Sequence, residues 1–119
     1  MIIDAHAHIF PDNIAEKAVE GIGDFYDMKT RMKGMVSDLL SAGERAGINK
    51  HIVHSVATLP EQVEKINDFI AKCVRENPDR LIGFATLHPE HTDVEGEIER
   101  AVSIGLKGVK IHQIGRAHV

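Results

Sequence analysis

Four short, nearly continuous apolar segments constrain the fold of this chain most strongly. They are residues 2–8, 51–57, 81–87 and 106–112. Between them lie longer segments in which apolar residues recur at helical spacing. Strands that are apolar on both faces are typical of parallel sheets, and their alternation with helices predicts right-handed βαβ units. We therefore expect an α/β protein with four parallel strands.

The segments between these strands carry helix signals. Residues 36–46 have helical spacing and are followed by Gly47, a typical C-terminal stop. Residues 58–61 (Thr-Leu-Pro-Glu) and 92–95 (Thr-Asp-Val-Glu) match the capping-box pattern of a helix start. The single cysteine, Cys73, falls on the apolar face of the intervening helix, so we expect a buried thiol rather than a reactive one.

Two architectures fit four consecutive parallel βα units: half of a (β/α)8 barrel, or an open doubly wound sheet. The pattern alone does not separate them. The chain has 119 residues, about half of the roughly 250 that a complete barrel needs. No glycine-rich phosphate-binding motif follows any of the strands, so a nucleotide-binding fold has no positive support.

The first apolar segment ends in a His-x-His pair. Side chains alternate along a strand, so His6 and His8 leave the same face roughly 6.5 Å apart, and we expect Asp4 on that face too. Two imidazoles so placed can bind one metal ion at about 2.0–2.1 Å. A chance pair facing water is the alternative. Asp4 either accepts a hydrogen bond from a metal-binding histidine and so orients it, or is a buried acid that accepts hydrogen bonds from backbone amides.

Four stretches resemble one enzyme family. They are residues 4–11 (DAHAHIFP), 55–58 (SVAT), 82–89 (IGFATLHP) and 105–112 (GLKGVKIH). Together they resemble the amidohydrolase superfamily, and more closely the metal-dependent TIM-barrel hydrolases of the amidohydrolase-2 group, which also contains decarboxylases. The resemblance implies that residues 1–112 are the first four βα units of a (β/α)8 barrel, which is an incomplete barrel.

The same resemblance implies a function. It implies a hydrolase in which a metal-activated water attacks a small-molecule substrate, with His6 and His8 as ligands of a divalent metal ion, zinc by expectation. In that family a histidine on strand five and an aspartate on strand eight complete the site, and the aspartate acts as general base. Neither strand is present here, so we expect this chain alone to be inactive. A metal-dependent decarboxylase of the same family and a small non-catalytic α/β binding protein remain alternatives.

Other polar residues are candidates for the mouth of the barrel. Lys110 and His112 share a face of the fourth strand, where we expect a substrate-anion contact; a carboxylated Lys110 bridging two metals is the alternative. His88 closes the third strand and either reaches the mouth or packs within its loop. The remaining histidines of the βα units are expected away from the site: His54 in the core, and His51 and His91 on the solvent side.

Two segments are expected to lie outside the regular units. Residues 9–34 form either a lid over the mouth or a surface excursion that packs its own aromatics. Residues 113–119 begin no turn, helix cap or apolar period, and residues 114–119 back-translate into a common sequencing-library adapter. We therefore expect 113–119 to be a non-native read-through tail, with a genuine short tail as the alternative.

The charge and composition of the chain argue against nucleic acid and membranes as binding partners. A formal net charge of -4 provides no basic field for nucleic acid or anionic membranes. No apolar run is long enough to span a bilayer, and no signal peptide precedes the first strand, so we expect a cytoplasmic location. For the full-length protein a homo-oligomer is a further expectation.

Overall fold

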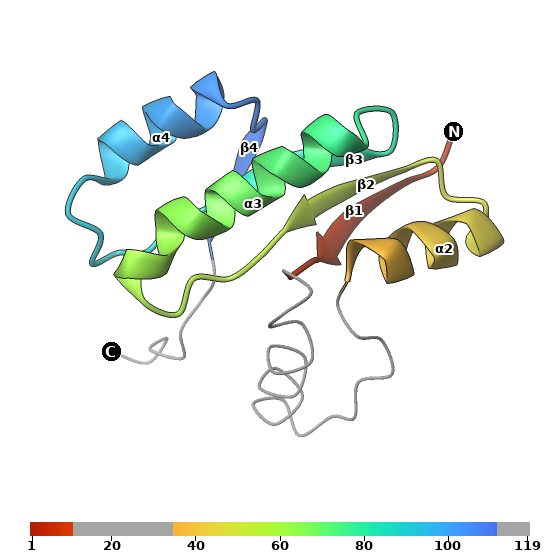
Figure 1. Cartoon of the computed structure of the whole chain (residues 1–119), viewed down its shortest axis with the longest axis horizontal. Coiled ribbons are helices and arrows are strands. Elements are labelled where there is room, and N and C mark those ends of the chain that lie inside the picture. The colour runs from red at the N-terminus through yellow and green to blue at the C-terminus, as the bar shows by residue number, and fades with distance from the viewer. Residues whose placement is uncertain (11–34, 112–119) are drawn as a thin grey trace.

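The computed structural model describes residues 1–10 and 35–111, and within them the predicted alternation of strands and helices is present (Figure 1). Residues 11–34, which include most of the segment expected to form a lid or a surface excursion, lie outside the described residues. His112 and the expected read-through tail, residues 113–119, lie outside them too. The elements in chain order are β1 (Ile3–His8), α2 (Val36–Ala46), β2 (Lys50–His54), the short 3-10 helix η1 (Pro60–Gln62), α3 (Val63–Glu76), β3 (Leu81–Thr86), α4 (Val94–Ser103) and β4 (Gly108–Lys110).

The strands form one parallel sheet in the order β1-β2-β3-β4. This confirms the predicted parallel arrangement. A doubly wound sheet changes direction beside its first strand, whereas a barrel adds each new strand to the same edge. The sequential order therefore separates the two architectures that the sequence left open, and it is the order of a half barrel.

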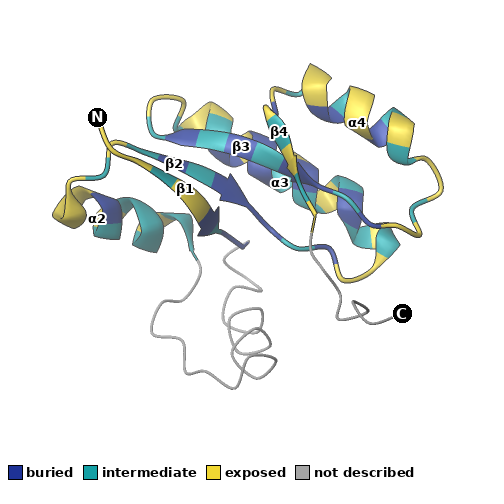
Figure 2. Ribbon diagram, turned by 180° about the vertical axis from the view of Figure 1, so that it is seen from behind, coloured by how far each residue is buried: buried dark blue, intermediate teal, exposed yellow. Residues whose placement is uncertain are grey.

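The helices described here cover the same face of the sheet. His51 of β2 lies under Gly43 of α2, where a Cβ would come within 2.4 Å of the His51 ring. A Cβ at Gly83 of β3 would come within 2.9 Å of Ile70 of α3 and 2.8 Å of Leu106, which follows α4. β2 and β3 pair in register, so His51 and Gly83 face the same side. Viewed from behind, the strands lie in front of α3, and this second face carries no helix of the described chain (Figure 2).

The apolar core lies between the sheet and its helices. Cys73 belongs to it and is buried, as predicted. Its other buried members come from α3, from α4, and from the strands and the residues next to them: Ala7, Ile9, Val53, Ile70, Ala71, Leu81, Ala85, Ala101 and Leu106. Partly buried residues of α2, such as Leu39 and Leu40, pack against them. The uncovered face is less protected, and apolar residues near the two outer strands, such as Ile3 and Ile111, are exposed.

Two helix starts use side chains other than those predicted. Before η1, the Oε1 atom of Gln62 accepts hydrogen bonds from the backbone amides of Thr58 and Leu59, so Gln62 takes the role expected of Glu61. At α4 the N-cap is Asp93, whose carboxylate accepts the amide of Gly96 at 3.0 Å. Both predicted helix starts are confirmed within two residues.

A buried asparagine fixes the carboxyl end of β3. Asn67 of α3 is fully buried; its Oδ1 accepts the amide of Thr86 at 2.7 Å and its Nδ2 donates to the carbonyl of Thr86 at 3.1 Å. Glu97, also buried, accepts hydrogen bonds from Arg100 and from Asn67. This network joins α3, α4 and β3 at the end of the sheet where β1 and β2 also end.

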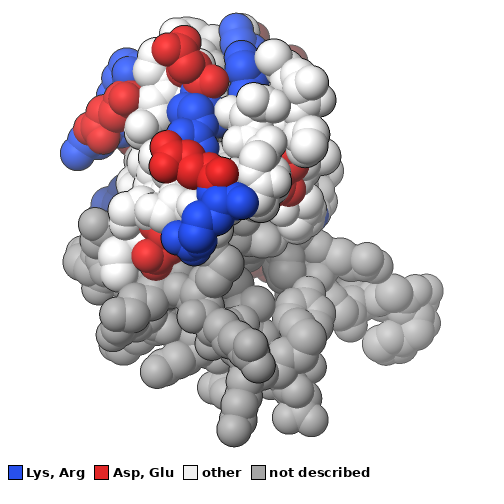
Figure 3. All heavy atoms as spheres, turned by 90° about the vertical axis from the view of Figure 1, so that its right-hand side faces the viewer, with Lys and Arg blue, Asp and Glu red and all other residues white. Residues whose placement is uncertain are grey.

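Acidic and basic side chains are mixed on the side of the molecule seen in Figure 3, with no broad patch of one sign. Ion pairs such as Arg80 with Glu44 contribute to this pattern. Among the described residues, no helix has both the length and the apolar character needed to cross a membrane.

Candidate metal centre

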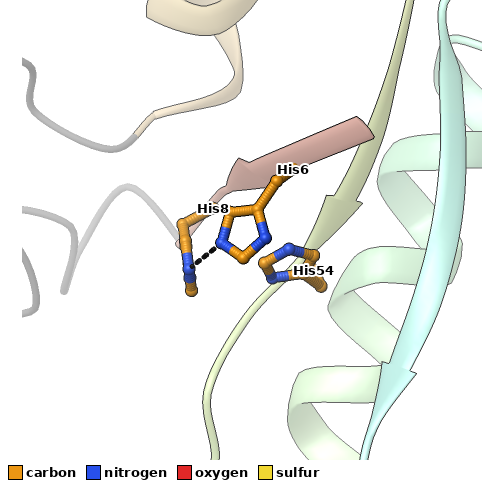
Figure 4. A group of neighbouring side chains, drawn as sticks. All are labelled: His6, His8 and His54. Carbon is orange, nitrogen blue, oxygen red and sulfur yellow. Dashed lines mark hydrogen bonds between the residues drawn. The ribbon is translucent and has the colours of Figure 1, made fainter. Parts of the chain in front are cut away.

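Three histidines meet at the carboxyl ends of β1 and β2. His8 and His54 are the last residues of their strands and pair in register, and His6 precedes His8 by two. The ring centroid of His54 lies 4.5 Å from that of His6 and 4.4 Å from that of His8. Figure 4 shows the three rings facing one another from the two neighbouring strands. We call this group the histidine cluster.

The spacing of the ring nitrogens fits a metal site. The Nε2 atoms of His6 and His8 lie 3.2 Å apart. Two ligands of a tetrahedral ion with bonds of about 2.0–2.1 Å stand roughly 3.3 Å apart. One nitrogen from each ring of the cluster lies within 4.8 Å of the others, so small rotations of the side chains bring all three within reach of one ion. The predicted ligands His6 and His8 are thus brought together.

Burial keeps His54 neutral. The residue is 2% exposed, and its Nδ1 atom has no hydrogen-bond partner among the described residues. Desolvation by burial and, after it, the electrostatic influence of His8, His6 and Lys110 lower the pKa of His54 to about 3, and Asp4 opposes this shift. Neutral imidazole is the form that binds metal ions.

A β-bulge in β1 overturns the expectation for Asp4. Asp4 pairs with His51 and Ala7 with Val53, so three steps along β1 match two along β2. The extra residue breaks the alternation of faces. The Asp4 carboxylate consequently reaches the Nδ1 atom of His51 at 3.3 Å, on the face that α2 covers, instead of sharing the face of His6.

Asp4 still acts on the cluster through the backbone. Its Oδ1 atom accepts the amide N–H of His6 at 3.1 Å, which holds the bulged backbone that carries this ring. The prediction that His51 faces solvent is wrong: the residue is 1% exposed, because α2 covers it and Asp4 satisfies one of its ring nitrogens. His91 was expected there too, yet only 9% of its side chain is exposed, and it bonds to Glu64.

The other candidates are distributed around the same end of the sheet. Lys110 is the last residue of β4, and its charge is near enough to act on His54. His88 is 6% exposed, and its Nδ1 atom accepts the amide of Glu90 at 3.1 Å, which places one side of its ring in the local turn. Their predicted contacts with a substrate stay predictions.

Sequence reasoning did not bring His54 into the cluster. It placed His54 in the core, and the residue is indeed buried, but its ring also contacts those of His6 and His8. The available signal was its position at the carboxyl end of a strand that follows the first one in a parallel sheet. Strands that are adjacent in the sheet bring their last residues side by side.

Comparison with known proteins supports the fold. Residues 3–117 match the family model described as Amidohydrolase. No curated protein sequence matches the chain.

Several solved structures have the same fold. 5-Carboxyvanillate decarboxylase from Sphingomonas paucimobilis matches with a TM-score of 0.74 and 19% identity, over 97% of this chain and 43% of that one. The enzyme of that name from Novosphingobium aromaticivorans, in complex with manganese, matches with a TM-score of 0.71 and 19% identity, over 96% and 42%. 4-Oxalomesaconate hydratase from Rhodopseudomonas palustris matches with a TM-score of 0.62 and 19% identity, over 92% and 40%.

The chain thus spans only about two fifths of the length of the proteins that it matches. At these identities the likeness establishes the fold alone. Together with the sequential strand order, it confirms the predicted architecture of four βα units of an incomplete (β/α)8 barrel.

Proposed function

Because the chain belongs to the amidohydrolase family, we propose that it supplies the N-terminal half of a metal-dependent enzyme. His6 and His8 are two protein ligands of its divalent ion. The observation that carries this proposal is the 3.2 Å separation of their Nε2 atoms at the carboxyl end of β1. That end of parallel strands is where barrel enzymes place their active sites.

The residues of this chain position the site. When bound, the ion supplies Lewis-acid chemistry that polarises a substrate and activates water. His6 and His8 hold it, and Asp4 anchors the amide of His6, so that the ring of His6 stays on the face opposite the helices. We assign to the complete protein the hydrolysis of a C–N or C–O bond in a small molecule. The general base lies outside this chain by the family's pattern.

Zinc is the ion that we expect. Imidazole nitrogens suit zinc, whereas manganese prefers sites richer in oxygen ligands. The histidine cluster offers imidazole nitrogens only. In a complete barrel, oxygen ligands from other strands would make the site more favourable to manganese. Zinc and manganese are therefore compared directly in the experiments below.

Decarboxylation is the second candidate reaction. The matching solved structures include 5-carboxyvanillate decarboxylases, whose substrate name denotes an aromatic carboxylate. In this chain the charge of Lys110 acts on His54, so a cation stands near the proposed ion, where a substrate carboxylate would bind. Lys110 serves either reaction if the substrate is an anion.

Metal analysis of the purified chain tests the ligand assignment. We expect one equivalent of zinc per chain after equilibration and gel filtration, and its loss in His6→Ala and His8→Ala. His91→Ala is the matched control, because it removes a histidine that bonds to Glu64 away from the cluster. Unchanged zinc content in both ligand variants would show that the assignment is wrong.

The reaction is tested in the complete reading frame that contains this chain. Loaded with zinc or with manganese, that protein is assayed for hydrolysis of amides, esters and lactones and for release of carbon dioxide from hydroxylated benzoates. Hydrolysis that a chelator abolishes supports the first reaction, and release of carbon dioxide without hydrolysis supports the second. Binding of a ligand with no metal-dependent turnover would leave a non-catalytic role.

A further inference from the structure

We propose that His54 is a third protein ligand of the same ion, so that three imidazoles from β1 and β2 hold the metal. This inference rests on the proposed function, because it assumes that His6 and His8 bind the ion. It adds a ligand from a second strand. It also implies that the chain binds metal without the rest of a barrel.

Burial without a hydrogen bond is the first argument. His54 is 2% exposed, and its Nδ1 atom finds no partner in the described part of the chain. A buried polar atom without a partner costs about 1–3 kcal/mol, so such atoms are rare and call for an explanation. The neighbouring buried histidine, His51, bonds to Asp4 through its Nδ1 atom, and its Nε2 atom, which lies under Gly43 of α2, also has no hydrogen-bond partner among the described residues. The ring of His54 differs in that it faces two other imidazoles. A metal ion would supply the interaction that the protein does not give to the ring of His54.

The position of the ring is the second argument. His54 contacts both predicted ligands at once, with centroid distances of 4.5 Å to His6 and 4.4 Å to His8 (Figure 4). A histidine that only fills the core needs no such placement, because an apolar side chain packs there at lower cost. One nitrogen from each of the three rings lies within 4.8 Å of the others.

The strand pairing makes this arrangement stiff. His8 and His54 are paired residues of adjacent strands, and the amide of Ile9 donates to the carbonyl of His54 at 3.0 Å directly beyond them. Because the backbone sets the separation of the two rings, little conformational entropy is lost on binding.

Nuclear magnetic resonance of the wild-type chain tests the inference without a mutation. Long-range proton–nitrogen spectra of ¹⁵N-labelled protein report each imidazole separately. On addition of one equivalent of zinc we expect large shifts of one ring nitrogen in each of His6, His8 and His54, and no comparable shift in His51 or His91. If His6 and His8 respond while the nitrogens of His54 keep their metal-free shifts, the inference is overturned and the proposed function stands.

Affinity measurements give an independent readout. In His54→Phe an aromatic ring remains in the core while the ligand nitrogens are lost, and we expect zinc to bind weaker by about tenfold or more. His91→Ala is again the control and is expected to bind like the wild type. If His54→Phe binds zinc with wild-type affinity while His6→Ala and His8→Ala lose it, His54 is not a ligand. The assignment of His6 and His8 then stands. Failure of the wild-type chain to bind zinc also overturns it, and the proposed function is then decided by the complete reading frame.

Discussion

Replacing Asn67 by leucine should destabilise the carboxyl end of β3. The proposed metal site lies at the same end of the sheet. The Oδ1 atom of Asn67 accepts the amide of Thr86 at 2.7 Å, and its Nδ2 atom donates to the carbonyl of the same residue at 3.1 Å. Leucine has the same branching at Cγ and is somewhat larger than asparagine, so Asn67→Leu removes the hydrogen bonds without leaving a cavity. Glu97 keeps its hydrogen bonds from Arg100.

The magnitude follows from the groups left without partners. A buried backbone amide with no acceptor costs about 1–3 kcal/mol, and loss of the bond to the carbonyl adds about 1 kcal/mol. Thr86 is 1% exposed and Asn67 is fully buried, so water does not replace these bonds without rearrangement. We therefore expect Asn67→Leu to lower the free energy of unfolding by roughly 2–4 kcal/mol.

Urea unfolding followed by far-ultraviolet circular dichroism measures this change, and hydrogen exchange of the Thr86 amide locates it. Asn77→Ala is the control, because the Asn77 side chain makes one hydrogen bond, to the carbonyl of Cys73, at a partly buried position. It should cost about 1 kcal/mol or less. An Asn67→Leu protein that unfolds within about 1 kcal/mol of the wild type, with the Thr86 amide still protected, would refute the reasoning.

Three further predictions address the packing and charge of the same structure. Gly43→Ala places a Cβ 2.4 Å from the Nε2 atom of His51, so we expect the free energy of unfolding to fall by about 1–3 kcal/mol. An unchanged midpoint of urea unfolding would contradict the tight contact of α2 with β2. Asp4→Ala removes the carboxylate that accepts the amide of His6, so it should weaken zinc binding about tenfold in the affinity measurements described above. An unchanged affinity would show that this hydrogen bond does not help to position the ring of His6. The hydrogen bond that the His91 ring donates to the Glu64 carboxylate raises the pKa of His91. This pair therefore stabilises the fold fully below the unfolded pKa of about 6.5, and the contribution is lost as the pH rises through the folded pKa. In Glu64→Gln this loss on the alkaline side should disappear from a plot of unfolding free energy against pH, and an identical plot would show that the pair contributes nothing.

Much of the fold was predictable because it is encoded locally. Apolar runs bounded by helix signals identify the strands and the three helices of the described chain to within a few residues. The largest differences are at β2, which ends three residues earlier than predicted, and at β4, which is two residues shorter at each end. The alternation of side chains along β1 also placed His6 and His8 together, since their geometry depends on only three consecutive residues. These features need no knowledge of which segments pair.

The remaining features depend on contacts between distant segments, and only the tertiary structure decided them. The strand order follows from which edge each new strand joins, and local periodicity is the same for a barrel and a doubly wound sheet. The bulge that turns Asp4 toward His51 is a mismatch between two strands and leaves no mark in either one alone. His54 joins the histidine cluster for the same reason: 46 positions separate it from His8 (54 − 8 = 46), and the parallel pairing of β1 with β2 places their last residues side by side.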